Sequence, residues 1–424
     1  MATGPSNVVA NLIIRQRYQS FPRLALRRSL PDVSIVLLVF AAVTLVFAVN
    51  GIRPPMYERS AVLRPPWMPV MLTTEFAPMW AGLLVVVTLV AAAFGAASSP
   101  IGRVGLGLAL GALTLFGLMI GRSIRSFDEI RTALAGIAEV PPPTRRWRSV
   151  FYPYPYRLRE GIERVDGLSY AADLFLDVYR STQDRAQRSP LLVHIHGGSW
   201  GGGNRRQMSQ PLIQEMAHRG WIVASVDYPL VPDATFPDQM IALHRALRWF
   251  RDSANELGID SSSIFVTGGS AGGHLAALLA LTDRDSDWST RRPEEEPVAG
   301  AVVAYGVFDL LDRKDIRDFW PIVTDLLIKG DPLVEPEKFR LGSPIDHVGP
   351  GAPPFLVIHG VNDSLVPIVE SEHFVTALRS VSEQPVAFAR IGGATHAFDA
   401  VDSLRTQNMV AGVAAFLETV ARTP

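Results

Sequence analysis

A serine between glycines separates a strand-like run from a helix-like run near the middle of the chain. Residues 268–272 have the pattern G-x-S-x-G around Ser270. They follow the apolar, β-branched run 263–267 and precede the run 274–280, which is rich in leucine and alanine. The sharp turn strains the backbone, so small residues near the serine avoid collisions with the strand and the helix. This order predicts a serine hydroxyl raised at the carboxyl edge of a sheet, where it can act as a nucleophile.

Strand-like and helix-like segments alternate over the last part of the chain, from residue 150 to residue 424. The strand-like segments are 174–179, 191–196, 221–226, 263–267, 298–305, 354–359 and 386–391. Such alternation predicts a mostly parallel sheet with helices on both faces. The expected fold class is therefore α/β.

A catalytic serine needs a base to take its proton and donors to hold the oxyanion that forms. The buried strand expected at 191–196 runs into H-G-G-S-W-G-G-G at 196–203. Successive glycines let backbone N–H groups point into a cleft. We expect the N–H groups of Gly197, Gly198 and Ala271 to form the oxyanion hole.

Two loops after later strands supply the acid and the base. Asp363 follows the strand expected at 354–359, and His396 follows the one expected at 386–391. We expect His396 to accept the proton of Ser270, and Asp363 to orient the imidazole. A histidine base predicts activity lost as the pH falls through the imidazole reference value of about 6.5.

Other acids and histidines have competing interpretations. Asp309 follows the preceding strand and is a second candidate acid, although its position favours capping of the segment that follows. His194 and His196 alternate onto one face of a strand, but no third ligand lies at metal-binding spacing. His274 and His359 are expected to have structural roles. The sequence predicts neither a metal nor a cofactor.

The joint pattern resembles the α/β-hydrolase superfamily, and within it the esterases related to hormone-sensitive lipase and the feruloyl-esterase-like and arylformamidase-like groups. The chain order of nucleophile, acid and histidine is the order in that superfamily. The matching segments, which lie between about residues 150 and 420, are 196–200, 227–230, 268–274, 359–363, 366–367 and 396–398. The resemblance implies a serine carboxylesterase that forms an acyl-enzyme.

One position departs from the lipase-like pattern. Those esterases usually have a third glycine where this chain has Ser199, which is followed by Trp200. The difference favours the feruloyl-esterase-like and formamidase-like groups, so the acyl-chain preference of the lipase-like branch is not carried over. We expect Ser199 and Trp200 to contact the substrate. The insertion 309–353 is expected to form a cap over the cleft, with a plain surface excursion as the alternative.

Three long apolar stretches without a charged residue precede the α/β part. They lie at about 33–50, 79–97 and 104–120. Each is close to the length that crosses a hydrocarbon core of about 30 Å. The sequence therefore predicts an N-terminal tail at 1–32, a membrane domain of three transmembrane helices at 33–120, a Pro- and Arg-containing linker at 121–149, and a hydrolase domain at 150–424.

Arginines around the first apolar stretch predict its orientation. Five precede it and three follow it before the second stretch, which favours a cytoplasmic amino end. Three spans then place the hydrolase domain on the extracytoplasmic side. Arginines after the third stretch oppose this orientation. A cleaved signal peptide is the competing interpretation, but the leader is long and no small-x-small site follows it.

Composition limits the partners. The net charge is −1 and no basic patch is interleaved with aromatic residues, so a nucleic-acid partner is not expected. The absence of cysteine excludes disulfides. Only three of the 40 basic residues are lysine, a bias typical of GC-rich bacterial genomes. The expected location is thus a bacterial cell membrane.

Three functions agree with these patterns. The first is a membrane-anchored serine carboxylesterase or lipase that acts on small-molecule or lipid-like esters. The second is an amidase, arylformamidase or peptidase that uses the same triad. The third is a non-catalytic sensor with a hydrolase fold, which would lack a triad member, whereas this chain has all three. The oligomeric state stays open.

Overall fold

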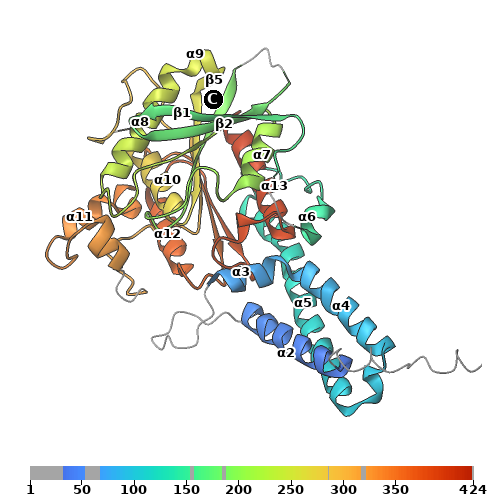
Figure 1. The fold of residues 1–424 in the computed structure, drawn as a ribbon. Helices are drawn as coiled ribbons and strands as arrows, with labels where there is room; N and C mark the ends of the chain where they lie inside the picture. The colour runs from blue at the N-terminus through green and yellow to red at the C-terminus, as the bar shows by residue number, and fades with distance from the viewer. Residues whose placement is uncertain are drawn as a thin grey trace, which may run out of the picture.

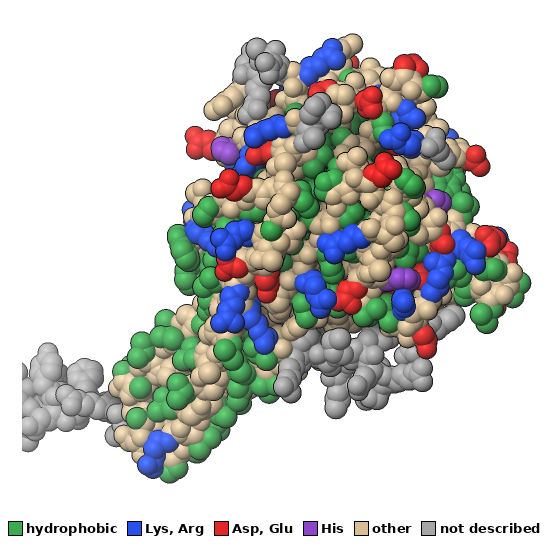
Figure 2. All heavy atoms as spheres, turned by 180° about the vertical axis from the view of Figure 1, so that it is seen from behind, with side chains coloured by type: hydrophobic (Ala, Val, Ile, Leu, Met, Phe, Trp, Pro, Cys, Tyr) green, Lys and Arg blue, Asp and Glu red, His purple; other side chains and the backbone are tan. Residues whose placement is uncertain are grey.

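An α/β domain lies at one end of a group of apolar helices (Figure 1). The computed structural model describes residues 32–52, 67–152, 157–183, 188–284, 286–316 and 321–422. Figure 2 shows hydrophobic side chains over most of the visible face of the helical part, whereas charged side chains gather on the α/β domain. The two parts therefore have surfaces of different character.

The α/β domain has one sheet of eight strands in the order β1-β2-β4-β3-β5-β6-β7-β8. The strands are β1 Ile162–Ala171, β2 Leu174–Ser181, β3 Ser189–Ile195, β4 Ile222–Val226, β5 Ile259–Gly269, β6 Gly300–Ala304, β7 Phe355–Gly360 and β8 Val386–Ile391. Strand β2 is antiparallel to β1 and β4, and all other pairs are parallel. Every residue of β4, β6 and β7 is buried, as expected of strands covered on both faces. The predicted mostly parallel sheet is confirmed.

Helices cover both faces of the sheet. One apolar cluster holds buried residues of α8 Asp238–Asp252, α10 Ala271–Thr282 and α12 Val369–Val381. A second cluster, on the other face, holds those of α7 Gln210–His218 and α13 Leu404–Val420. The short helices are α6 Trp147–Phe151, α9 Ala254–Leu257, α11 Pro336–Leu341, the 3-10 turns Ala96–Ser98, Pro344–His347 and Phe398–Ala400, and a π-helical turn Ile322–Leu327. The core is thus divided by the sheet.

Four α-helices lie in the described residues of the N-terminal part. They are α2 Val33–Ile52, α3 Trp67–Glu75, α4 Ala77–Ala93 and α5 Pro100–Ala133. By length and composition α2 and α5 can each cross a membrane, and α3 with α4 adds a third candidate only if the pair, bent by 72°, is counted as one span. The α/β domain is therefore preceded by two or three candidate membrane helices. The arginines before residue 32 and within 53–66 lie outside the described residues.

Helix α5 extends beyond the apolar stretch that predicted it. Residues 121–133, which were expected to begin a linker, are its last turns. They are helical because they pack on the α/β domain: the Asn408 side chain of α13 donates to the Ser123 carbonyl and to the Ser126 hydroxyl, both at 2.9 Å. Irregular chain follows only at 138–146. The linker at 121–149 is thus corrected to a shorter segment.

The insertion expected as a cap at 309–353 is folded against the α/β domain. Its side chains Val323, Leu327 and Phe339 belong to the apolar cluster on the α10 face. The Leu327 carbonyl also accepts a hydrogen bond from the Phe236 N–H at 2.8 Å. Residues 317–320 lie outside the described residues. A cap function stays a prediction.

Candidate active site

Ser270 occupies a sharp turn between β5 and α10. Its backbone has φ 58° and ψ −125°, a conformation that strains a residue with a side chain. A Cβ atom on Gly268 would lie 2.4 Å from the Gly272 carbonyl oxygen, and one on Gly272 would lie 2.1 Å from the Ile195 oxygen. Glycine is therefore required on both sides of the serine, as the motif predicts.

The structure brings the three predicted triad residues together. The Nε2 atom of His396 lies 2.9 Å from the Ser270 hydroxyl oxygen, and its Nδ1 atom lies 2.8 Å from Oδ2 of Asp363. A carboxylate only accepts hydrogen bonds, so Nδ1 carries the proton and Nε2 is left to accept from Ser270. The three side chains follow β5, β7 and β8, whose carboxyl ends share one edge of the sheet.

The carboxyl group of Asp363 is fixed on both oxygens. Its Oδ1 atom accepts the N–H groups of Leu365 and Val366, both at 2.9 Å, and Nε2 of His359 lies 3.4 Å from Oδ2. Burial raises the pKa of Asp363, but His396 and His359 lower it by more, so the pKa lies well below its usual range. Asp363 is therefore the ionised partner of His396.

His359 was expected to have only a structural role. Its Nδ1 atom lies 2.6 Å from the Ser371 hydroxyl, and its Nε2 atom lies 2.9 Å from the Val366 carbonyl. It thus fixes the acid loop while also contacting Asp363. Its position at the end of β7, four residues before the acid, is the sequence signal for this contact.

The competing acid Asp309 caps a turn instead. Its two carboxylate oxygens accept the N–H groups of Leu311 and Arg313 at 3.1 and 3.0 Å. This is the capping role that its sequence position favoured.

The glycines expected in the oxyanion hole lie beside the nucleophile. A Cβ atom on Gly197 would lie 2.8 Å from the Gly269 oxygen and 3.3 Å from the Ser270 Cβ atom. Gly198 has φ 128°, which a side chain rarely allows. Ala271 begins α10 directly after Ser270, so its N–H is one of the donors at a helix N-terminus that have no partner within the helix. All three predicted donors therefore belong to segments that meet at Ser270.

The side chain of Trp200 is buried in the apolar core, with 1% exposure. Its contact with the substrate stays a prediction. Its indole N–H donates to Nδ1 of His274 at 3.1 Å, and Nε2 of His274 lies 2.7 Å from the Gly342 carbonyl. Trp200 therefore links the glycine loop to α10. Ser199, with φ 53°, stays exposed.

His194 in β3 and His196, which directly follows that strand, have structural partners. Nδ1 of His194 lies 2.8 Å from the Ser225 hydroxyl, and the His196 ring stacks on Tyr228 with centroids 4.4 Å apart. Burial, with a smaller contribution from His196, lowers the pKa of His194 to about 3. Within the described ranges no group of three potential ligand residues could hold a metal ion.

Two residues near His396 were missed by the sequence analysis. The Tyr305 ring lies edge-on to the His396 imidazole at 4.9 Å, and its hydroxyl donates to Asp399. The Ser209 hydroxyl donates to the other Asp399 oxygen at 2.9 Å. The available signals were that Tyr305 follows β6, the neighbour of β5, and that Asp399 comes three residues after His396.

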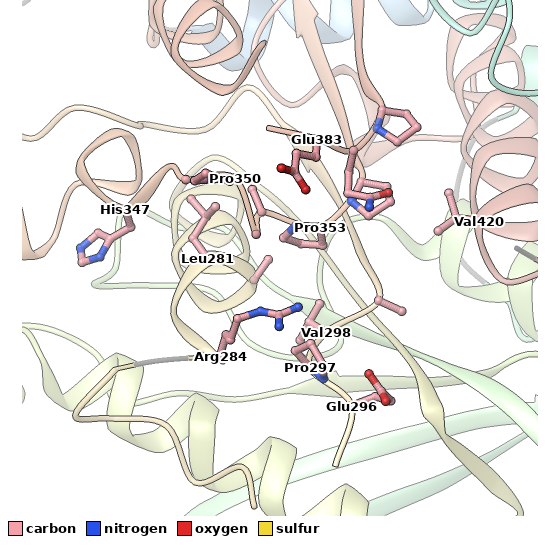
Figure 3. A pocket seen from close by; sticks show the side chains of 18 of the residues that line it. Leu281, Arg284, Glu296, Pro297, Val298, His347, Pro350, Pro353, Glu383 and Val420 are labelled. Carbon is pink, nitrogen blue, oxygen red and sulfur yellow. The ribbon is translucent and has the colours of Figure 1, made fainter. Parts of the chain in front are cut away.

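A cavity of about 910 Å³ lies elsewhere in the domain (Figure 3). Its lining includes Pro297, Pro353 and Pro385, which precede β6, β7 and β8. It therefore opens at the amino ends of these parallel strands, whereas the triad lies at their carboxyl ends. The cavity is not part of the candidate site.

Comparisons with known proteins agree with this geometry. Residues 176–378 match the BD-FAE family. The chain is 36% identical to the probable carboxylic ester hydrolase LipM of Mycobacterium tuberculosis over 297 residues, which are 69% of this chain and 68% of that protein. It is 34% identical to the esterase LipC of the same organism over 305 residues, 71% of this chain and 74% of the relative.

A solved structure shows the same fold. It is a truncated form of a carbohydrate esterase from gut microbiota, with a TM-score of 0.53 and 24% identity, covering 61% of this chain and 97% of that one. The mostly parallel sheet and its helices therefore occur in an experimentally determined esterase. Together with the relatives, this shows that the chain belongs to the carboxylic ester hydrolases with an α/β-hydrolase fold.

Proposed function

We propose that the protein is a membrane-anchored serine carboxylesterase in which Ser270, His396 and Asp363 form the catalytic triad. The observation that carries the proposal is the unbroken chain of contacts at 2.9 and 2.8 Å from hydroxyl to imidazole to carboxylate. The names of the relatives support ester hydrolysis as the reaction.

The reaction follows from these positions. Nε2 of His396 takes the proton of Ser270 as the serine oxygen attacks the ester carbonyl. The N–H groups of Gly197, Gly198 and Ala271 hold the oxyanion. Collapse breaks the ester C–O bond, the alcohol leaves with the proton from His396, and the acyl group stays on the serine. Water, deprotonated by His396, then attacks the acyl carbon; the bond to the serine oxygen breaks, His396 returns the proton to that oxygen, and the carboxylic acid is released.

The apolar helices support membrane anchoring. Large side chains such as Val39, Leu89 and Leu110 are 56%, 64% and 68% exposed on α2, α4 and α5. Such outward apolar faces suit contact with lipid. An anchor raises the local concentration of a substrate that resides in the membrane, so a lipid-like ester is the proposed substrate class. The hydrolase domain is proposed to lie outside the cytoplasm of a bacterial cell.

Replacing Ser270 by alanine tests the proposal. In the full-length protein in detergent, Ser270→Ala is expected to lower p-nitrophenyl ester turnover by about 10³-fold or more, because the nucleophile is lost. The control is Ser380→Ala on α12, an exposed serine whose hydroxyl donates to the Ala377 carbonyl of the same helix; it should keep full turnover.

The same assay with a p-nitroanilide separates esterase from amidase. Faster turnover of the ester supports the proposal, and a preference for the anilide contradicts the substrate class. Turnover that survives in Ser270→Ala contradicts the mechanism itself.

A further inference from the structure

The N-terminal helices contact the loop that carries the catalytic acid. The side-chain amide of Asn362 donates to the carbonyl of Ile52, the last residue of α2, at 3.3 Å. Asn362 directly precedes Asp363. This end of a candidate membrane helix therefore meets the chain one residue from the triad.

A second contact lies at the beginning of the histidine loop. Glu129 of α5 accepts the N–H of Gly392 at 2.8 Å. Gly392 follows the last residue of β8 and opens the loop that ends in His396. The next residue, Gly393, has φ 71°, and a Cβ atom there would lie 3.0 Å from Cδ of Arg122, also on α5. Helix α5 thus binds the backbone N–H of Gly392 and limits the room for a side chain at position 393.

A third contact lies after the histidine loop and is buried. Glu75, the last residue of α3, accepts hydrogen bonds from the guanidinium of Arg405 and, at 2.6 Å, from the Ser403 hydroxyl. The Glu75 and Arg405 side chains are 0% and 1% exposed. Ser403 is also the N-cap of α13 and accepts the Thr406 N–H at 3.1 Å. The carboxylate therefore holds the cap of the helix that follows His396.

Glu75 is the single charged residue in the sequence between residues 67 and 99. A charge within an apolar segment is costly to place, and when kept it usually has a functional partner. Replacing a buried ion pair by apolar residues is often neutral or stabilising, so stability alone explains such a pair poorly. Charge-assisted hydrogen bonds do, however, fix geometry. Because this pair lies beside the histidine loop, the geometry that it fixes is that of the chain around His396.

From these contacts we infer that the N-terminal helices position the His396 loop, with Glu129 fixing its beginning and Glu75 and Arg405 fixing the segment that follows it. They are positioning residues, because they act on the imidazole through the loop and not on the substrate. The inference rests on the proposed function of His396 as the base. It makes the membrane helices part of the catalytic framework in addition to an anchor.

Glu129→Ala is the first test, since Glu129 is only partly buried and its loss should leave the fold intact. We expect kcat for a p-nitrophenyl ester to fall by about 10- to 100-fold with KM nearly unchanged, because a misplaced base slows the chemistry without altering substrate contacts. The matched control is the neighbouring Asp128→Ala, an exposed residue that pairs with Arg131 of the same helix. It should keep the wild-type kcat.

Glu75→Gln is the second test. Its control, Asp283→Asn, breaks another buried ion pair, with Arg251, whose side chains are 0% and 1% exposed. Asp283 directly follows the end of α10, about 20 Å along the helix axis from Ser270. Both variants should lower the melting temperature, but only Glu75→Gln should lower kcat measured well below that temperature.

The outcomes separate the inference from the function on which it rests. Wild-type kcat in Glu129→Ala overturns the positioning role, even if Glu75→Gln fails to fold. Equal kcat losses in Glu75→Gln and Asp283→Asn also overturn it, because they indicate general destabilisation. If Ser270→Ala hydrolyses the ester at the wild-type rate, the proposed function itself is contradicted.

Discussion

Two buried carboxyl groups lie near His396, and their surroundings shift their pKa values in opposite directions. For Asp363, the nearby histidines outweigh the effect of burial, so the pKa is lowered. For Asp399, burial outweighs the hydrogen bonds from Tyr305 and Ser209, so the pKa is raised. Paired groups with diverging pKa values commonly have different roles. Asp363 thus supplies the negative charge, and Asp399 serves as a hydrogen-bonding partner of Tyr305.

Asp399→Asn tests this difference through stability. A carboxyl whose pKa is raised on folding stabilises the fold below its unfolded pKa, and that contribution is lost as the pH rises through the folded value. Asparagine cannot ionise and keeps an acceptor for Tyr305. The melting temperature of the variant minus that of the wild type should therefore increase as the pH rises above about 3.9. A constant difference from pH 4 to pH 8 would exclude a raised pKa.

The turn between β5 and α10 is the element most sensitive to a small substitution. A methyl group at Gly272 would lie 2.1 Å from the Ile195 oxygen and 2.7 Å from the His196 oxygen, so the backbone around Ser270 must move. We expect Gly272→Ala to destabilise the protein by about 1–3 kcal/mol and to reduce ester turnover by about 100-fold.

A glycine with free space around it is the control for that variant. A Cβ atom at Gly349 has no neighbour within 4 Å, so Gly349→Ala should change neither property. Thermal unfolding and p-nitrophenyl ester turnover measure both effects. Full activity in Gly272→Ala would contradict this expectation, because it would show that the turn accommodates a methyl group without displacing Ser270.

The sequence predicted the elements that hold the triad because parallel strands place their carboxyl ends on one edge. The loops with Ser270, Asp363 and His396 therefore converge whatever the details of packing. The burial of Trp200 could not be predicted, because its hydrogen bond to His274 joins residues 74 positions apart. Strand β1 was missed because it is a half-exposed edge strand, with charged Glu163 and Arg164 among its residues.

The end of α5 could not be predicted from hydropathy. Charged residues such as Arg122 and Arg125 end the apolar stretch, whereas the helix continues to Ala133. Its last turns are stabilised by the α/β domain, where a Cβ atom on Gly412 of α13 would lie 2.2 Å from a methyl group of Ile130. Such a close helix contact depends on residues more than 280 positions apart. Local sequence patterns therefore cannot predict this contact.

The two parts of the protein form one connected structure. Helix α5 contacts both β8 and α13, and the irregular segment after it is tied down by Arg146, which forms two hydrogen bonds with Asp402 at 2.7 and 2.8 Å. In Figure 1 the N-terminal helices adjoin the α/β domain on the side where α13 begins. The triad edge is therefore the side of the domain that meets the apolar helices, which suits an enzyme for esters at a membrane surface.

Mass spectrometry of the full-length protein after fluorophosphonate treatment directly identifies the nucleophile. The reagent bonds to an activated serine, and digestion then locates the added mass. We predict one adduct per chain, on the peptide that carries Ser270, formed in step with the loss of ester turnover and slowed by an ester substrate. Complete loss of turnover with the adduct on a different serine would contradict the assignment of Ser270, and with it the proposed triad.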